Sequence, residues 1–293
     1  MSPPGCSAAW PEGVIRLGAG KPLAVVKGAG DLATGVACRL FRCGLDVIMT
    51  EIESPLVVRR TVAFAEAVYN GCIKVEGIEA CLAGSVEHAL ELAGRRVIPV
   101  LADPGAGVVK MLRPAVVVDA IMAKRNLGTS INDAPLVIGL GPGFAAGADV
   151  HAVVETKRGH NLGRVIYSGG AAPDTGIPGP VAGYAAERLL RSPADGVLDP
   201  CRSIGQRVEK GEVVAFVDGS PVRAEIPGIV RGMVKEGLRA SRGMKIGDID
   251  PRCEEAHCHS ISDKALAVAG GVLEAVFSFL AGYSACRELG IRN

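Results

Sequence analysis

The sequence has few aromatic side chains and almost no net charge. Phe, Trp and Tyr make up 4% of the chain, and 32 Lys and Arg are balanced by 31 Asp and Glu. A chain without excess positive charge has no bulk attraction to nucleic acid or to anionic membranes. We therefore expect small-molecule or protein partners, with no nucleic acid and no membrane among them, while a homo-oligomer stays open.

The sequence pattern also predicts neither a secretory signal peptide nor a membrane-spanning helix. Residues 1–13 lack the basic and apolar regions of a secretory signal. The only stretch resembling a span, 265–283, contains Gly270-Gly271 and a central Glu274, which indicate a buried helix instead. The nine cysteines are an odd number. Together these features predict free thiols in a reducing cytoplasm, with residues 1–20 as a loose tail.

Glycine, in contrast, is abundant and marks one turn in particular. Gly28, Gly30 and Ala33 fit G-x-G-x-x-G/A between an apolar run and a helical pattern, as in dinucleotide-binding turns. Glu51 ends the next predicted strand, 21 residues past Gly30, where such folds contact ribose hydroxyls. The motif predicts that the turn up to Thr34 holds the phosphates of a nucleotide such as NAD(P), ATP or CTP, with Glu51 on its ribose.

One residue of this turn departs from a nucleotide site. Asp31 places a carboxylate at the helix N-terminus, where it would cap the helix and repel a pyrophosphate. Arg59 lies on a helix predicted over 54–69. Its side chain either clamps an anion near the ribose or belongs to a solvated face of the helix. A purely structural strand-turn-helix is therefore the open alternative to a nucleotide site.

The following segments alternate between strand and helix patterns. Strands are expected at 72–75, 96–101, 115–118 and 135–140, and helices at 85–93 and 181–191. This alternation predicts a Rossmann-like parallel sheet over 21–193, covered on both faces. Acids that end strands, such as Asp119, would then gather at the carboxyl edge, where open α/β sheets place ligands.

A second group of glycine-rich turns follows within the same region. Gly141 and Gly143 end the strand 135–140, and a hairpin of 150–156 with 164–167 is expected next. Its turn carries Lys157, Arg158 and His160, and the glycine-rich loop 169–180 carries Thr175. Glycine turns can aim backbone N–H groups at an anion, and arginine adds a planar fork. The turn predicts recognition of a phosphorylated small molecule; the alternative is a solvated hairpin tip.

A repeat organises residues 194–252. Gly196 and Gly211 are 15 residues apart, as are Gly228 and Gly243, and the two copies are offset by 32. The pattern resembles a barrel-sandwich hybrid, the fold of biotinyl and lipoyl carriers. The connection 217–221 has no lysine for a cofactor, so this small all-β module is expected to be a scaffold. Residues 253–293 are expected to form a linker and a C-terminal helix that packs on the α/β domain.

The linker contains a short group of metal-ligand residue types. Cys253, His257, Cys258 and His259 form C-x3-H-C-H, which suits a soft metal or selenium. Adjacent ligands do not easily share one tetrahedral ion, and the spacing fits no structural zinc module. We therefore expect a thiol-rich linker and no metal site.

Several strings together carry a family resemblance. They are Gly28–Gly35, Thr50–Glu53, Arg59–Phe64, Asp119–Lys124, Gly141–Phe144, Glu155–His160, Lys245–Arg252 and Ser262–Lys264. From about residue 23 to 280 the chain resembles the YqeB-type family of the selenium-dependent molybdenum hydroxylase system. The resemblance implies a cytoplasmic accessory protein that helps to mature xanthine dehydrogenase-like selenium-dependent molybdenum hydroxylases, distantly similar in role to XdhC-type factors. It implies no catalytic residue.

Two function classes follow. The first is a maturation factor that binds an anionic cofactor, a nucleotide or molybdenum cofactor, at the carboxyl edge of the sheet. The second is an NAD(P)-dependent oxidoreductase. Asp31 and the lack of a recognisable His–acid pair favour the first. The candidate cofactor-binding residues are Gly28, Gly30, Asp31, Thr34, Glu51, Arg59, Asp119, Lys124, Gly141, Gly143, Lys157, Arg158, His160 and Thr175.

Overall fold

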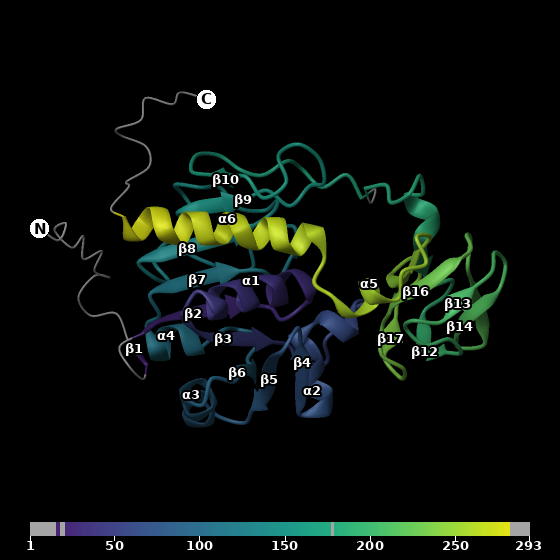
Figure 1. Ribbon diagram of the computed structural model, residues 1–293, viewed down its shortest axis with the longest axis horizontal. Helices are drawn as coiled ribbons and strands as arrows, with labels where there is room; N and C mark the ends of the chain where they lie inside the picture. The colour runs from purple at the N-terminus through teal and green to yellow at the C-terminus, as the bar shows by residue number, and fades with distance from the viewer. Residues whose placement is uncertain (1–15, 18–20, 177–178, 282–293) are drawn as a thin grey trace, which may run out of the picture.

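A computed structural model describes residues 16–17, 21–176 and 179–281 (Figure 1). Its largest element is a ten-stranded sheet with the strand order β10-β9-β8-β7-β2-β3-β6-β5-β4, and β1 pairs with β2. The strands are β1 (Arg16–Leu17), β2 (Lys21–Lys27), β3 (Asp46–Glu51), β4 (Cys72–Val75), β5 (Ile78–Ala83), β6 (Ile98–Ala102), β7 (Val116–Asp119), β8 (Leu136–Leu140), β9 (Ala152–Val154) and β10 (Val165–Ile166).

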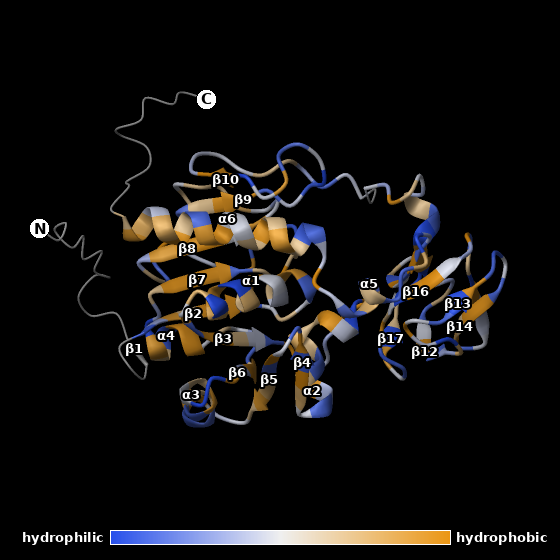
Figure 2. Ribbon diagram, in the orientation of Figure 1, coloured by the Kyte–Doolittle hydropathy of each residue, from blue (hydrophilic) through white to orange (hydrophobic). Residues whose placement is uncertain are grey.

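Helices cover both faces of this sheet. The long helix α6 (Asp263–Leu280) and α1 (Asp31–Arg42) pack on one face, and α3 (Val86–Gly94) and α4 (Val108–Leu112) pack on the other. Successive residues of a strand point to opposite faces, so Val26 of β2 joins the first core and Val25 joins the second. Figure 2 shows the resulting apolar strands between the helices.

The expectation of a Rossmann-like parallel sheet is wrong, because the sheet is mixed. β1, β4 and β10 pair antiparallel with β2, β5 and β9. The two-residue turn Glu76–Gly77 joins β4 to β5, and such short connections permit only antiparallel neighbours. The described connections 120–135 and 141–151 contain no helix, so the second half lacks the crossovers of a doubly wound sheet. The fold is a mixed sheet with two antiparallel sheets and a C-terminal helix.

Two predicted helices are absent from the described residues. Residues 54–69 contain only η1 (Arg60–Val62), η2 (Phe64–Glu66) and the start of α2 (Ala67–Asn70). Here the backbone at Val58 contacts Gly232, and Arg60 Nε donates to the carbonyl of Met233, so that tertiary contacts override the helical pattern. Residues 181–191 instead form η3 (Ala186–Arg188) and a strand.

The remaining strands form two four-stranded antiparallel sheets around a separate core, at one end of the molecule (Figure 1). One contains β11 (Leu189–Arg191), β18 (Lys245–Asp250), β16 (Gly228–Met233) and β13 (Arg207–Val208); the other contains β15 (Ser220–Arg223), β14 (Val213–Val217), β12 (Gly196–Pro200) and β17 (Arg239–Ala240). The glycine repeat has a structural basis. Gly196 and Gly228 begin β12 and β16, and Gly211 and Gly243 both have positive φ in turns.

The cysteine expectation is wrong for one pair. Cys72 and Cys81 face each other across the β4–β5 hairpin and form a disulfide, whereas we expected free thiols. The other described cysteines, such as the buried Cys38 and Cys258, are free. Within the described ranges, no helix has the length and apolarity needed to cross a bilayer.

Candidate functional site

Charged side chains gather where the large sheet meets the antiparallel sheets. The contributing elements are the segment after β3, the N-terminal ends of α1 and α6, η3, strand β16, strand β18 with the residues that follow it, and the turn after β9. We call this group the cationic junction. Its cations are Arg59, Arg158, Arg188, Arg231, Lys245, Arg252 and Lys264, and its carboxylates are Asp31, Asp248, Asp250 and Asp263. Among these residues cations outnumber carboxylates, so the junction favours an anion.

Arg59 is the most deeply buried cation that faces α1. Its side chain is 8% exposed, and its Nη2 donates to the carbonyls of His257 (2.8 Å) and Ser260 (3.0 Å). Its Nη1 lies 3.7 Å from Asp31 Oδ2, and its Nε and Nη1 have no hydrogen-bond partner among the described residues. Burial lowers the pKa of the Arg59 guanidinium, Arg231 lowers it further, and Asp31 opposes both. Two donor atoms of a buried cation thus lack a hydrogen-bond acceptor among the described residues.

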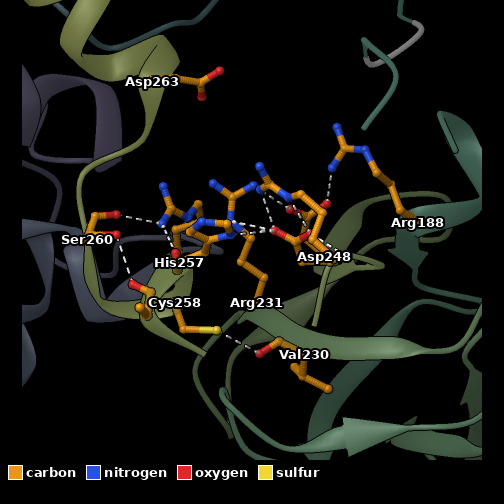
Figure 3. Close-up of polar contacts among 12 residues, drawn as sticks. Arg188, Val230, Arg231, Asp248, His257, Cys258, Ser260 and Asp263 are labelled. Atoms are coloured by element: carbon orange, nitrogen blue, oxygen red, sulfur yellow. Dashed lines mark hydrogen bonds and ion pairs between the residues drawn. The ribbon is translucent and has the colours of Figure 1, made fainter. Parts of the chain in front are cut away.

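Strands β16 and β18 supply the core of the junction (Figure 3). Asp248 and Asp250 share one face of β18 because the side-chain period of a strand is two. Arg188 forms a close ion pair with Asp248, while Arg231 lies 4.0 Å from Asp248 and 3.7 Å from Asp250. Arg252 Nη2 is 2.6 Å from Asp250 Oδ2. Burial opposes ionisation of Asp250, but the hydrogen bonds from Arg252 hold its pKa below the usual value.

Two lysines complete the cationic side that faces Asp31. Lys245 begins β18 and Lys264 lies in the first turn of α6. Burial lowers the pKa of both amines; Asp248 and, less strongly, Asp31 oppose this at Lys245, and Asp31 opposes it at Lys264. The Lys245 Nζ atom is 3.9 Å from Asp248 Oδ1. Asp31 is therefore a single, partly exposed carboxylate that faces Arg59 and two lysines.

Arg158 reaches the junction from the turn after β9. Its two terminal nitrogens donate to both oxygens of Asp263, at 2.6 and 2.8 Å. Hydrogen bonds from Arg158 hold the pKa of Asp263 well below its usual range, although partial burial opposes them. Glu155 shapes this turn, since its oxygens accept from the amides of Lys157 and Ala172. The turn and the start of α6 are thus tied together.

The glycine turn lies beside the junction, but its contacts are partly internal. Gly28 has φ +88°, and a Cβ there would approach the Ala120 carbonyl to 3.1 Å. Glu51 Oε2 accepts from the Ala29 amide at 2.9 Å, so the carboxylate predicted to hold a ribose supports the turn itself. At Gly30, the N-cap of α1, no described atom would lie within 4 Å of a Cβ. Because the N-cap residue is glycine, no side chain caps α1 at this position.

Thr34 and Asp119 are buried, and both accept hydrogen bonds from other parts of the chain. Thr34 Oγ1 accepts from the Phe64 amide, which joins α1 to η2. Asp119 accepts from Thr129 Oγ1 at 2.6 Å, and Thr129 in turn accepts from Lys27 Nζ at 2.5 Å. All three members of this network are less than 9% exposed. The network fastens the loop after β7 to the end of β2, so Asp119 is placed to support the loop.

The other predicted residues are spread over neighbouring turns. Lys124 Nζ lies 2.6 Å from Asp174 Oδ2 in an exposed ion pair. Gly141 and Gly143 have positive φ, and a Cβ at either position would clash with Thr156 or with the backbone at Arg125. Lys157, His160 and Thr175 are exposed. Only Asp31, Arg59 and Arg158 of the predicted residues belong to the cationic junction.

Sequence reasoning missed most of the junction, namely Arg188, Arg231, Lys245, Asp248, Asp250, Arg252, Asp263 and Lys264. One signal was available. Asp248 and Asp250 occupy alternate positions of a strand that also carries Ile246 and Ile249, and a charged face on a strand inside a small module usually has partners. The contact with α1 could not be predicted, because more than 200 positions separate Asp31 from Lys245.

The C-x3-H-C-H segment lies at the edge of the junction. Cys258 is buried beneath Arg59 and Arg231, with Sγ 3.8 Å from the Val230 carbonyl, and burial raises its pKa. His257 Nδ1 lies 3.9 Å from Asp250 Oδ2. Within the described part of the chain, no three His, Cys, Asp or Glu side chains are arranged to hold a metal ion.

Comparisons with known proteins place the chain near one relative. No protein-family model matches it. Solved structures with partial similarity are an aspartoacylase family protein from Mesorhizobium loti (15% identity, 80% of this chain and 86% of that chain, TM-score 0.26) and a succinylglutamate desuccinylase/aspartoacylase from Rhodobacter sphaeroides (14%, 78% and 85%, TM-score 0.25). TM-scores this low carry no inference about activity.

The sequence relative is far more similar. The chain is 49% identical over 271 residues to the uncharacterized protein YqeB of Escherichia coli (strain K12). The match covers 92% of this chain and 50% of that protein, so the chain spans about half the length of the relative. The similarity to YqeB therefore extends over most of this chain.

Proposed function

We propose that the protein is an accessory factor that holds an anionic cofactor at the cationic junction during the maturation of selenium-dependent molybdenum hydroxylases. The observation that carries the binding proposal is the buried guanidinium of Arg59, whose Nε and Nη1 have no hydrogen-bond partner among the described residues. A buried donor without a partner costs about 1–3 kcal/mol, and more when it is charged. An anionic ligand that accepts from Arg59 would remove this cost.

The surroundings of Arg59 suit a phosphate group. Lys245 and Lys264 add positive charge, and α1 begins at Asp31, so the partial positive charge of its N-terminus adds to theirs. Asp31 is the only carboxylate of the junction within 4 Å of Arg59 in the described structure. Because the Asp31 side chain is partly exposed, it can turn toward solvent. A bound phosphate would then compete with its carboxylate for Arg59. A nucleotide and a phosphorylated pterin such as molybdenum cofactor both carry the required charge.

The maturation role is supported by the resemblance of the sequence strings, whereas the similarity to the uncharacterized protein YqeB supports no particular role. The proposed protein partner is a xanthine dehydrogenase-like selenium-dependent molybdenum hydroxylase. The glycine turn does not favour the oxidoreductase alternative, because the Ala29 amide already donates to Glu51, the carboxylate expected to bind the ribose of the nucleotide. We therefore keep the maturation role as the proposed function.

Calorimetric titration with NAD, NADP, ATP, CTP and a phosphorylated pterin tests the binding. Charge-assisted hydrogen bonds are worth about 1.5–3 kcal/mol, so Arg59→Lys, which keeps the charge but loses the fork, should weaken binding about tenfold or more. Asp31→Asn should tighten it, because the competing carboxylate is gone. Arg96→Lys is the matched control, since Arg96 stacks on Phe41, and it should leave affinity unchanged.

Two results would contradict the proposal. If none of these anions gives heat, or if Asp31→Asn weakens binding, the junction is not their site. The maturation role is tested separately by deleting the gene and measuring the molybdenum and selenium content and the activity of the hydroxylase. Unchanged content and activity would refute that role.

A further inference from the structure

A pocket lies at the edge of the mixed sheet opposite to the cationic junction. A pocket of about 690 Å³ opens between the end of α4 and residues 131–135, at the amino ends of β8 and β9. The parallel strands run from this edge toward the cationic junction. The pocket is therefore separate from the cationic junction, where the proposed function is located.

His151 gives the pocket a fixed hydrogen-bond donor. Its Nδ1 accepts from the Val137 amide at 3.0 Å, while its own amide donates to the Val137 carbonyl at 2.8 Å. A ring nitrogen that accepts a hydrogen bond carries no proton, so the neutral ring has its proton on Nε2. Burial lowers the pKa of His151, which keeps the ring neutral at pH 7. His151 thus lines the pocket with a neutral ring in which Nε2 is the nitrogen that can donate.

The other polar groups of the pocket are mainly donors too. Lys110 and Arg113 come from α4 and its C-cap, and Asn132 comes from the facing segment. Asp133 is the one acid of the lining, and its Oδ2 accepts from the Ser130 amide at 3.1 Å. The rest of the lining is apolar, provided by Val109, Pro114, Ile131, Ala134 and Pro135.

We propose that this pocket binds a small organic anion, whose carboxylate or phosphate group accepts from Arg113 and His151 Nε2 and whose apolar part packs against Val109 and Ile131. A guanidinium fork matches either oxyanion. An apolar wall distinguishes such a ligand from an inorganic ion, since burial of apolar area adds to the affinity. The excess of donors over acceptors disfavours a cation.

Nuclear magnetic resonance of the full chain with ¹⁵N-labelled histidine tests this site. The probes are benzoate and phenyl phosphate, with inorganic phosphate and benzylammonium as comparisons. Benzoate or phenyl phosphate should shift the His151 Nε2 signal with saturation, and whichever binds more tightly identifies the preferred oxyanion. Inorganic phosphate should bind at least tenfold more weakly, and benzylammonium should leave the signal unchanged.

Variants separate the pocket from non-specific binding. Arg113→Asn suits the left-handed backbone at this position (φ 41°), and it should weaken the better probe at least tenfold. Lys110→Gln should weaken it less, and Arg95→Asn, outside the lining, should have no effect. The proposal is overturned if neither organic anion shifts His151, if benzylammonium shifts it equally, if inorganic phosphate binds as tightly as phenyl phosphate, or if Arg113→Asn leaves affinity unchanged.

Discussion

Two adjacent glycines of α6 should respond in opposite ways to the same substitution. Gly270 is exposed, and no described atom would lie within 4 Å of a Cβ at this position. Gly271 is buried, and a Cβ there would lie 2.2 Å from the Gly163 carbonyl oxygen and 2.8 Å from Val154 Cγ1. The helix therefore contacts the turn after β9 through a position where only glycine fits.

The expected free energies follow from these contacts. In a helix interior alanine is favoured over glycine by about 0.8–1.0 kcal/mol, so Gly270→Ala should raise the free energy of unfolding by about that amount. Gly271→Ala has the same gain but overpacks the interface, which typically costs about 1–3 kcal/mol. The obstacle is a backbone carbonyl, which cannot rotate away as a side chain does. We expect a cost at the upper end, and a net loss of about 2 kcal/mol.

Urea unfolding followed by circular dichroism measures both variants, with the m-value as a check that the native state keeps its compactness. The difference in unfolding free energy between wild type and Gly270→Ala measures the effect of helix propensity alone. The difference between the two variants then measures the cost of the close contact at Gly271. If both substitutions stabilise the protein equally, the close approach of α6 to Gly163 is refuted.

Three further predictions concern the turns around the junction. Thr129→Val removes both hydrogen bonds of the Lys27–Thr129–Asp119 network at nearly constant volume; it should cost about 3 kcal/mol in urea unfolding, whereas Thr129→Ser should cost under about 1 kcal/mol, and equal losses would contradict a role for the hydroxyl. Gly28→Ala forces φ +88° on a residue with a Cβ and should lower the free energy of unfolding by at least about 1–2 kcal/mol, measured in the same way; an unchanged midpoint would refute the close contact with Ala120. Asp263 has a depressed folded-state pKa, so its contribution is present above the unfolded value of about 3.9 and is lost as pH falls through the folded value. Asp263→Asn should therefore destabilise the protein at pH 7, by under about 1 kcal/mol because the pair is exposed, and the difference from wild type should shrink below pH 4; a difference that grows in acid would reverse the assigned sign.

Local patterns predicted the elements whose signals are complete within a few residues. The helix α1 begins directly after Gly30, and Ser85 caps α3 through a hydrogen bond from the His88 amide. The hairpin of β9 and β10 is confirmed as well. Positive φ values at Gly28, Gly141 and Gly143 explain why glycine occupies those turns. Each of these features depends on neighbours in the chain, so periodicity and turn chemistry are enough to find them.

The errors occurred where distant contacts override local preference. Residues 54–69 carry a helical pattern, yet Arg60 donates to Met233 and Val58 packs against Gly232, which holds this segment in another conformation. Cys72 and Cys81 bond because the β4–β5 hairpin brings them face to face. The parallel sheet was overestimated because edge strands resemble interior strands until their partners are known.

By itself the sequence determined the glycine turns, the helices at 31–42 and 86–94, the repeat of two β units and the resemblance to a YqeB-type family. Only the tertiary structure decided how charges combine. Arg59 takes its partners from His257, Ser260 and Asp31, and Lys245 approaches Asp31 across the junction. Electrostatic interactions depend on distance in space and on burial, neither of which a linear pattern contains. The cationic junction therefore exists only once the antiparallel sheets pack against the segment after β3, where Arg60 donates to the Met233 carbonyl.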